Sequence, residues 1–146
     1  MIPIVTGTLG ILAMAVLYRL VTREKTGTPD MKRISGYIQE GAQAFIKREV
    51  RTISYFIVAL VIILFFLLGW EISVGFALGA SLSVLAMIIG MKAAVKANVR
   101  TVNVARSSAE KALQLAFQGG GVMGLGTISI NLLGIILLYF LFSVGP

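Results

Sequence analysis

The sequence contains no cysteine and no histidine. Disulfides, thiol nucleophiles, imidazole bases and the common zinc ligands are therefore absent together. Charged side chains are also scarce, at 13% of residues, whereas soluble domains carry roughly 25%. These absences exclude much familiar enzyme chemistry and disfavour an ordinary soluble domain.

Apolar residues make up 58% of the 146 residues, and the mean hydropathy is +0.94. They form four uncharged runs, at residues 2–18, 53–70, 72–91 and 112–146, and a helix needs about 20 apolar residues to cross a bilayer. The sequence predicts an all-α membrane protein with one membrane domain over residues 1–146. We expect spans at about 2–21, 53–70, 72–91 and 122–142, with cytoplasmic helical extensions at about 29–52 and 92–121.

The basic residues predict the orientation. Residues 19–51 hold eight Lys and Arg and residues 92–111 hold five, which together are all 13 in the chain. Because basic loops stay in the cytoplasm, we expect both segments inside and both termini outside. A cleaved signal peptide is disfavoured for the first run, whose charges follow the apolar stretch. The net charge of +7 is thus explained beside the membrane, and no nucleic-acid partner is expected.

Local signals define the helix ends. Thr28, Pro29 and Asp30 supply an N-cap, a proline for the first turn and an early acid, so a helix should begin there and continue unbroken to Trp70. Its first half is amphipathic, with apolar positions at Ile34, Ile38, Ala42, Phe45 and Ile46. The short turn at residues 69–71 predicts an antiparallel hairpin with Trp70 at the membrane interface. The basic face Lys92, Lys96 and Arg100 predicts that the third helix extends beyond its span.

Small residues in the apolar runs favour close helix packing. The pairs Gly120 and Gly124, and Gly75 and Gly79 followed by Ser83, have the four-residue spacing that lets helix backbones approach in lipid. Gly119, Gly121 and Gly124 match a dinucleotide-binding spacing, but no strand precedes them, so we reject that interpretation. Asn131 should face other helices and form a structural hydrogen bond.

No catalytic, cofactor-binding or metal-binding residue is predicted in this chain. The six carboxylates show no spacing that brings several together, as magnesium-phosphate chemistry requires. None of the four runs contains an ionisable Asp, Glu, Lys or Arg for an ion pathway. The loop cations could contact phosphate or anionic lipid, but their place beside the spans already explains them.

Three segments carry a family resemblance. Residues 38–49 read IQEGAQAFIKRE, residues 90–101 read GMKAAVKANVRT and residues 112–125 read ALQLAFQGGGVMGL. In order and spacing they resemble the membrane-bound, ion-translocating inorganic pyrophosphatases near their N terminus. Small departures are Val50 in place of an aromatic, Asn103 in place of alanine and Gln118 in place of a basic residue.

The resemblance implies a larger protein. The family's members are sixteen-helix homodimers that hydrolyse pyrophosphate at the cytoplasmic face and pump H+ or Na+ outward, with Mg²⁺ and in some members K+. The resemblance covers about the first quarter of these proteins. We therefore expect an N-terminal fragment whose last residues, 142–146, come just after a span. The fragment would form outer-shell helices in a prokaryotic plasma membrane, with the remaining helices as its partners and no activity of its own.

Two other functions stay open. A stand-alone small membrane protein with an assembly or lipid-interacting role would use the basic amphipathic segment at residues 31–51. A small channel or transporter formed from several four-helix units is less favoured, because the spans contain no midplane charge or discontinuous segment.

Overall fold

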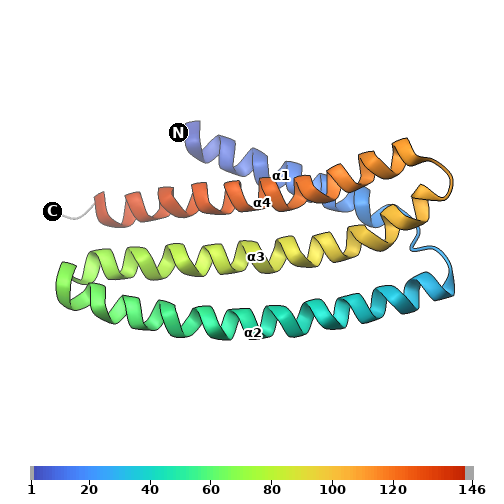
Figure 1. Ribbon diagram of the computed structural model, residues 1–146. Helices are drawn as coiled ribbons and strands as arrows, with labels where there is room; N and C mark the ends of the chain where they lie inside the picture. Colours follow the sequence, from blue (N-terminus) through green and yellow to red (C-terminus); the bar gives the residue numbers. More distant parts are fainter. Residues whose placement is uncertain (1, 144–146) are drawn as a thin grey trace.

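The computed structural model describes residues 2–143 and contains four helices and no strand in that range. They are α1 (Ile2–Arg23), α2 (Pro29–Leu68), α3 (Trp70–Ala105) and α4 (Ala109–Ser143), which run alternately up and down in an elongated bundle (Figure 1). All four are long and apolar enough to cross a membrane. The prediction of an all-α membrane protein with four spanning helices is confirmed.

The start of α2 follows its sequence signals. The Thr28 side chain accepts a hydrogen bond from the backbone N–H of Met31, and Pro29 occupies the first turn. Asp30 lies beside Arg33, with 3.3 Å between the carboxylate and guanidinium atoms. The helix continues without interruption for 40 residues, or about 60 Å at about 1.5 Å per residue. The predicted long continuous helix is confirmed, and it ends at Leu68 instead of Trp70.

A single residue separates α2 from α3. Gly69 has φ +91° and ψ 175°, a conformation that other residues rarely adopt, and α3 begins at Trp70. The Ser73 hydroxyl donates to the Gly69 carbonyl over 2.9 Å and steadies the first turn of α3. The Trp70 indole is 59% exposed and lies 5.8 Å from the Phe142 ring, so the chain has an aromatic contact at this end.

The opposite end connects α3 to α4 through a short turn at residues 106–108. The backbone N–H of Lys111 donates to the Ser108 side chain, which caps the start of α4. The third helix continues past Met91 to Ala105, and the position at which it leaves the membrane stays a prediction. Residues 112–143 of the last uncharged run lie within one continuous helix, α4, which spans 35 residues, about 52 Å.

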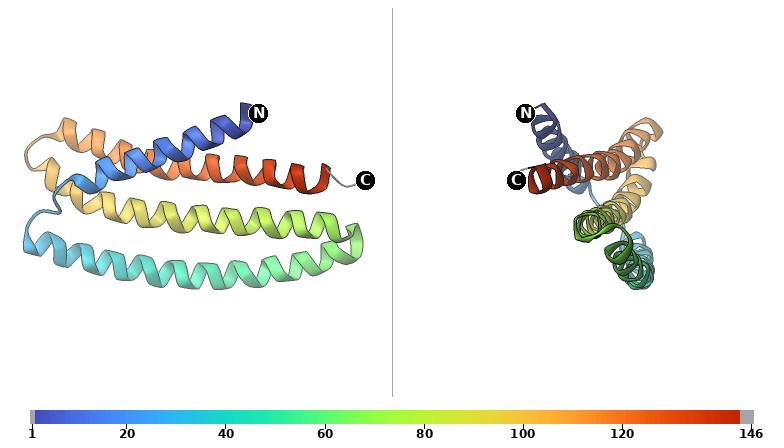
Figure 2. Two further views of the ribbon diagram at one scale, coloured as in Figure 1. Left: turned by 180° about the vertical axis from the view of Figure 1, so that it is seen from behind. Right: turned by 90° about the vertical axis from the view of Figure 1, so that its left-hand side faces the viewer.

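Helix α3 occupies the centre of the bundle. It packs against α4 and α2 and more briefly against α1, while α1 packs mainly on α4. Figure 2 shows this arrangement from the end, with α1 and α4 on one side of α3 and α2 on the other. Within the described residues α2 contacts only α3, and no residue of its most apolar stretch is buried.

Glycines allow the close contacts of α1, α3 and α4. They are not the glycines that the sequence analysis predicted. A Cβ atom added at Gly119 would lie 2.7 Å from the Ala97 Cβ atom, and one at Gly7 would lie 2.8 Å from the Leu133 side chain. Added Cβ atoms at the four predicted positions would meet no atom within 4 Å; these are Gly75, Gly79, Gly120 and Gly124. These four glycines therefore make no such contact within residues 2–143, and their packing against other helices stays a prediction, because a four-residue spacing identifies a face without identifying its partner.

Candidate functional site

The connection between α1 and α2 is held against α3 by side chains of α3. Arg100 donates through Nε to the Glu24 carbonyl over 3.1 Å, and Asn103 donates through Nδ2 to the Lys25 carbonyl over 3.1 Å. Gly27, at φ +85°, lets the backbone turn beside Asn103. We call these contacts the loop clamp. It satisfies backbone carbonyls that a connection without helical hydrogen bonds leaves open.

A further contact of the same face reaches α1. The Lys96 ammonium donates to the Tyr18 hydroxyl over 2.7 Å and lies 5.4 Å from the centre of the Tyr18 ring. Lys96, Arg100 and Asn103 are four and three residues apart, so they share one face of α3. Sequence reasoning identified the basic face but missed Tyr18 as its partner and treated Asn103 only as a departure from the family.

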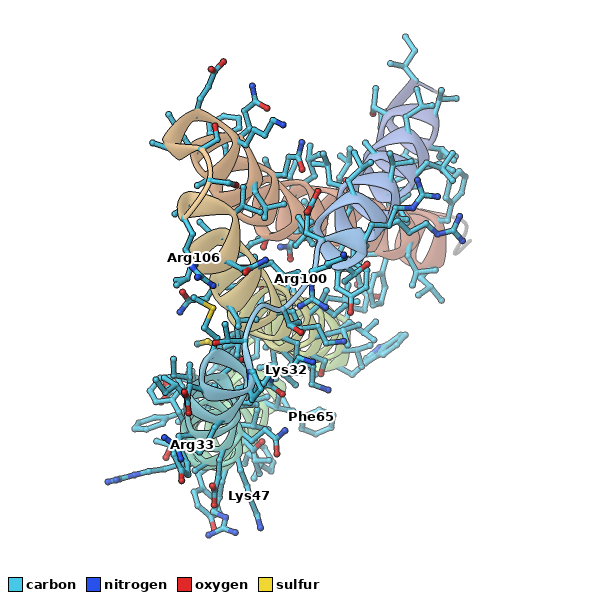
Figure 3. The ribbon with its side chains drawn as sticks, turned by 90° about the vertical axis from the view of Figure 1, so that its right-hand side faces the viewer. Lys32, Arg33, Lys47, Phe65, Arg100 and Arg106 are labelled. Atoms are coloured by element: carbon cyan, nitrogen blue, oxygen red, sulfur yellow. The ribbon has the colours of Figure 1, made fainter. Side chains whose placement is uncertain are left out.

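This end of the bundle is basic on several helices. Figure 3, viewed from this end, shows Lys32 and Arg33 on α2, Arg100 on α3 and Arg106 in the turn that follows α3. Among residues 2–143 the structure forms one ion pair, Arg33 with Asp30. Arg100 donates to the Glu24 carbonyl, whereas Lys32 and Arg106 form no ion pair among these residues and can contact water, phosphate groups or lipid headgroups.

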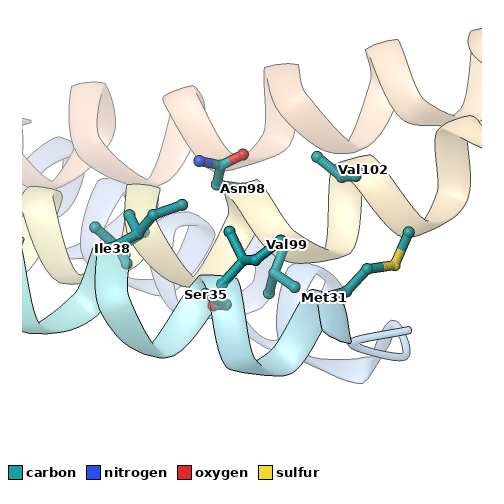
Figure 4. A pocket seen from close by; sticks show the side chains of 8 residues that line it. Met31, Ser35, Ile38, Asn98, Val99 and Val102 are labelled. Carbon is teal, nitrogen blue, oxygen red and sulfur yellow. The ribbon is translucent and has the colours of Figure 1, made fainter. Parts of the chain in front are cut away.

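A shallow groove separates the first half of α2 from α3. Its cavity of about 100 Å³ is shown in Figure 4, where Met31, Ser35 and Ile38 of α2 lie opposite Val99 and other residues of α3. The amphipathic segment thus directs part of its apolar face at α3, although Phe45 remains 52% exposed. A ligand pocket usually measures roughly 300–1,000 Å³, so this groove is a packing seam and not a substrate site.

The polar residues within the apolar part of α4 form structural hydrogen bonds. The Ser83 hydroxyl of α3 donates to Asn131 Oδ1 over 3.4 Å, and Asn131 Nδ2 donates to the Thr127 carbonyl over 2.8 Å. The prediction that Asn131 faces another helix is confirmed. Ser129 is buried at the contact with Gly10 of α1. Hydroxyl and amide groups alone position helices and supply no proton relay.

The six carboxylates are distributed along the chain. Glu24 lies in the first connection, Asp30, Glu40 and Glu49 lie on α2, and Glu71 and Glu110 lie in the first turns of α3 and α4. Within residues 2–143 no three acidic side chains come together in a group that could hold a metal ion. Mg²⁺ takes carboxylate and phosphate oxygens, so the residues described here do not fit a magnesium site.

Four long apolar helices, with every Lys and Arg confined to residues 19–51 and 92–111, define a polytopic α-helical membrane protein. A comparison with protein families identifies the family to which this membrane protein belongs. The family model of inorganic H+ pyrophosphatase matches residues 8–145. The chain belongs to this family, as the resemblance of its three segments predicts.

Several relatives are pumps from bacteria and archaea. A putative K+-stimulated pyrophosphate-energized sodium pump of Clostridium tetani is 38% identical over 140 residues, covering 96% of this chain and 21% of the relative. The K+-stimulated sodium pump of Thermotoga maritima is 40% identical over 131 residues, covering 88% and 18%. A K+-insensitive pyrophosphate-energized proton pump of Methanosarcina mazei is 40% identical over 139 residues, covering 94% and 21%. The chain thus spans about a fifth of the length of these relatives.

Proposed function

We propose that this chain is the N-terminal part of a membrane pyrophosphatase that couples pyrophosphate hydrolysis at the cytoplasmic face to outward pumping of H+ or Na+. The family match over residues 8–145 carries this proposal, because it covers nearly every residue of the chain. Relatives of both kinds, sodium pumps and proton pumps, have similar identity to the chain. The pumped ion is therefore assigned only as one of these two.

The orientation follows from the distribution of charge. Every Lys and Arg lies in residues 19–51 or 92–111, and the helix connections within these two segments, α1–α2 and α3–α4, lie at one end of the bundle. By the positive-inside rule this end faces the cytoplasm of a prokaryotic cell, and both termini face outward. Pyrophosphate would then be hydrolysed on the side that contains the loop clamp.

The role of these four helices is structural. Their described residues offer no acidic cluster for Mg²⁺, and their spans contain no charge that could carry an ion. We assign Mg²⁺ binding, and any K+ dependence, to helices outside this chain. The chain would supply outer-shell helices to a homodimer, with the open glycines of α3 and α4 facing the remaining helices.

The experiment expresses the complete reading frame that contains this chain in bacterial membranes and measures phosphate release from pyrophosphate. We expect release that requires Mg²⁺ and drives Na+ or H+ into inside-out vesicles. Acidification of the vesicles without Na+ uptake would identify a proton pump. Na+ uptake without acidification would identify a sodium pump. The 146 residues alone, in the same membranes, should release no phosphate above the background of empty membranes.

Two results would contradict the proposal. A complete protein that is inserted in the membrane but hydrolyses no pyrophosphate would remove the enzymatic assignment. Mg²⁺-dependent phosphate release by the 146 residues alone would show that a catalytic site lies within them, against the scattered carboxylates.

A further inference from the structure

A cavity of about 370 Å³ opens where α1 crosses α3 and α4, apart from the groove and the loop clamp. Its residues come from all three helices and fall into two kinds. Arg19 and Lys92 are basic and accompany Tyr18, whereas Met14, Ala15, Ile89 and Val122 are apolar or small. The cavity thus combines cationic groups with an apolar wall. A purely polar ligand would not need the apolar wall.

The two cations lie at the boundary of the membrane. Arg19 directly follows the uncharged run at residues 2–18, and Lys92 directly follows the run at residues 72–91. Arg19 lies near the end of α1 (Ile2–Arg23) and Lys92 lies in the second half of α3 (Trp70–Ala105). Both helices end at the same end of the bundle (Figure 1). Both cations therefore lie at the level where lipid headgroups meet the hydrocarbon.

The charge around this cavity is not neutralised. No carboxylate lines it, and the one ion pair among residues 2–143 joins Arg33 and Asp30. Lys96 adds a third cation beside the cavity, because its ammonium donates to the hydroxyl of Tyr18. Such a site favours an anion, and basic pockets between membrane helices bind anionic lipid headgroups.

We propose that this cavity binds one anionic phospholipid. Arg19 and Lys92 would hold its phosphate, and an acyl chain would lie along Met14 and Ile89. Charge complementarity selects the anionic headgroup, and the apolar wall selects a lipid over a free phosphate ion. The proposal does not depend on pyrophosphate hydrolysis, so an inactive complete protein would leave it standing.

The test measures lipid binding to the purified complete protein by native mass spectrometry, with phosphatidylglycerol as the probe and phosphatidylcholine as the zwitterionic reference. The double variant Arg19→Gln and Lys92→Gln should bind phosphatidylglycerol about 30-fold more weakly, because it lacks two headgroup contacts. The matched control, Arg106→Gln and Lys111→Gln, removes two cations from the same end outside this cavity and should bind it as the unaltered protein does.

Two further arms separate a lipid from its alternatives. Ala15→Phe fills the apolar part while keeping both charges, and should weaken phosphatidylglycerol binding as well. This variant keeps the proposal testable if the double variant misfolds. The charge-conserving pair Arg19→Lys and Lys92→Arg serves the same purpose and should still bind the lipid. Displacement of the lipid by excess inorganic phosphate, unchanged binding in the Ala15→Phe variant, or equal loss in the control pair would overturn the proposal.

Discussion

Helix α2 and the group formed by α1, α3 and α4 are built differently. In the group, α3 alone buries Ala86, Gly90, Ala93 and Ala97, and glycines of α1 and α4 bring backbones close to neighbouring side chains. In α2 the one buried residue is Ser35, while Phe66 and Leu67 near its end are 79% and 74% exposed. One region is a packed unit, and the other is an arm attached along a single neighbour.

The difference reflects how helices associate in lipid. Burying a large apolar side chain against another helix gains little, because lipid tails are equally apolar. Close approach of backbones through small residues gains van der Waals contact, and α1, α3 and α4 contain those residues at their contacts. The last part of α2 is rich in Ile, Leu and Phe, which suit a surface in lipid.

The largest effect is expected at the contact of α4 with α3. Gly119→Leu forces a side chain into the space occupied by Ala97, which has no flexible end that can move aside, so the free energy of unfolding should fall by about 3 kcal/mol. Gly120→Leu is the matched control on the next residue, which faces open space. The midpoint of SDS-induced unfolding of the chain compares the two. Equal destabilisation by both variants would show that this contact does not hold the packed unit together.

A smaller effect is expected where the arm joins the unit. Gly69→Ala places a Cβ atom at φ +91°, a strained conformation that should cost about 1–3 kcal/mol although no neighbouring atom obstructs it. Gly75→Ala is the control, because that position is helical and open, and alanine favours a helix. The same unfolding midpoint should fall for the first variant and stay or rise for the second. A rise for both would contradict the hairpin geometry.

Removing a hydrogen bond of the loop clamp should lower the free energy of unfolding by about 1 kcal/mol. Asn103→Ala removes the donor to the Lys25 carbonyl, whereas Asn98→Ala changes the same residue type on the same helix within the α2–α3 groove. Limited proteolysis at the connection between α1 and α2 should accelerate in the first variant more than in the second. Unchanged cleavage in both would mean that Asn103 does not restrain this connection.

The smallest effect is expected inside the apolar region. Asn131→Leu removes the acceptor of the Ser83 hydroxyl, and interhelical hydrogen bonds in membranes contribute on average about 0.6 kcal/mol. A double-mutant cycle with Ser83→Ala isolates this coupling from the change in side-chain volume. A coupling free energy near zero would reduce Asn131 to a bond within α4, where it donates to the Thr127 carbonyl.

Features set by neighbouring residues could be predicted from the sequence. Thr28 begins α2 because its side chain reaches an N–H three residues along, and Gly69 ends the helix because its backbone leaves the helical region. The interhelical role of Asn131 followed from the cost of a polar group in lipid. These predictions need no knowledge of which helices are neighbours.

Features set by helix rotation could not be predicted in this way. Gly119 and Gly120 are adjacent and chemically identical. A Cβ atom added at Gly119 would contact Ala97, whereas one added at Gly120 would have no neighbour within 4 Å. The loop clamp joins side chains to backbone carbonyls more than 70 residues away, and carbonyls have no signature in a sequence. The cavity between α1, α3 and α4 depends on the crossing of three helices in the same way.

In the proposed function these helices form the outer shell of a pump, and open glycines face its remaining helices. Gly75 and Gly79 lie four residues apart on α3, and both face open space in this chain. The most direct measurement is pyrophosphate hydrolysis by the complete protein with Gly75→Leu and Gly79→Leu, beside the unfolding midpoint of the 146 residues with the same changes. We expect a large loss of hydrolysis with an unchanged midpoint, whereas full hydrolysis in that variant would show that these glycines do not face the remaining helices.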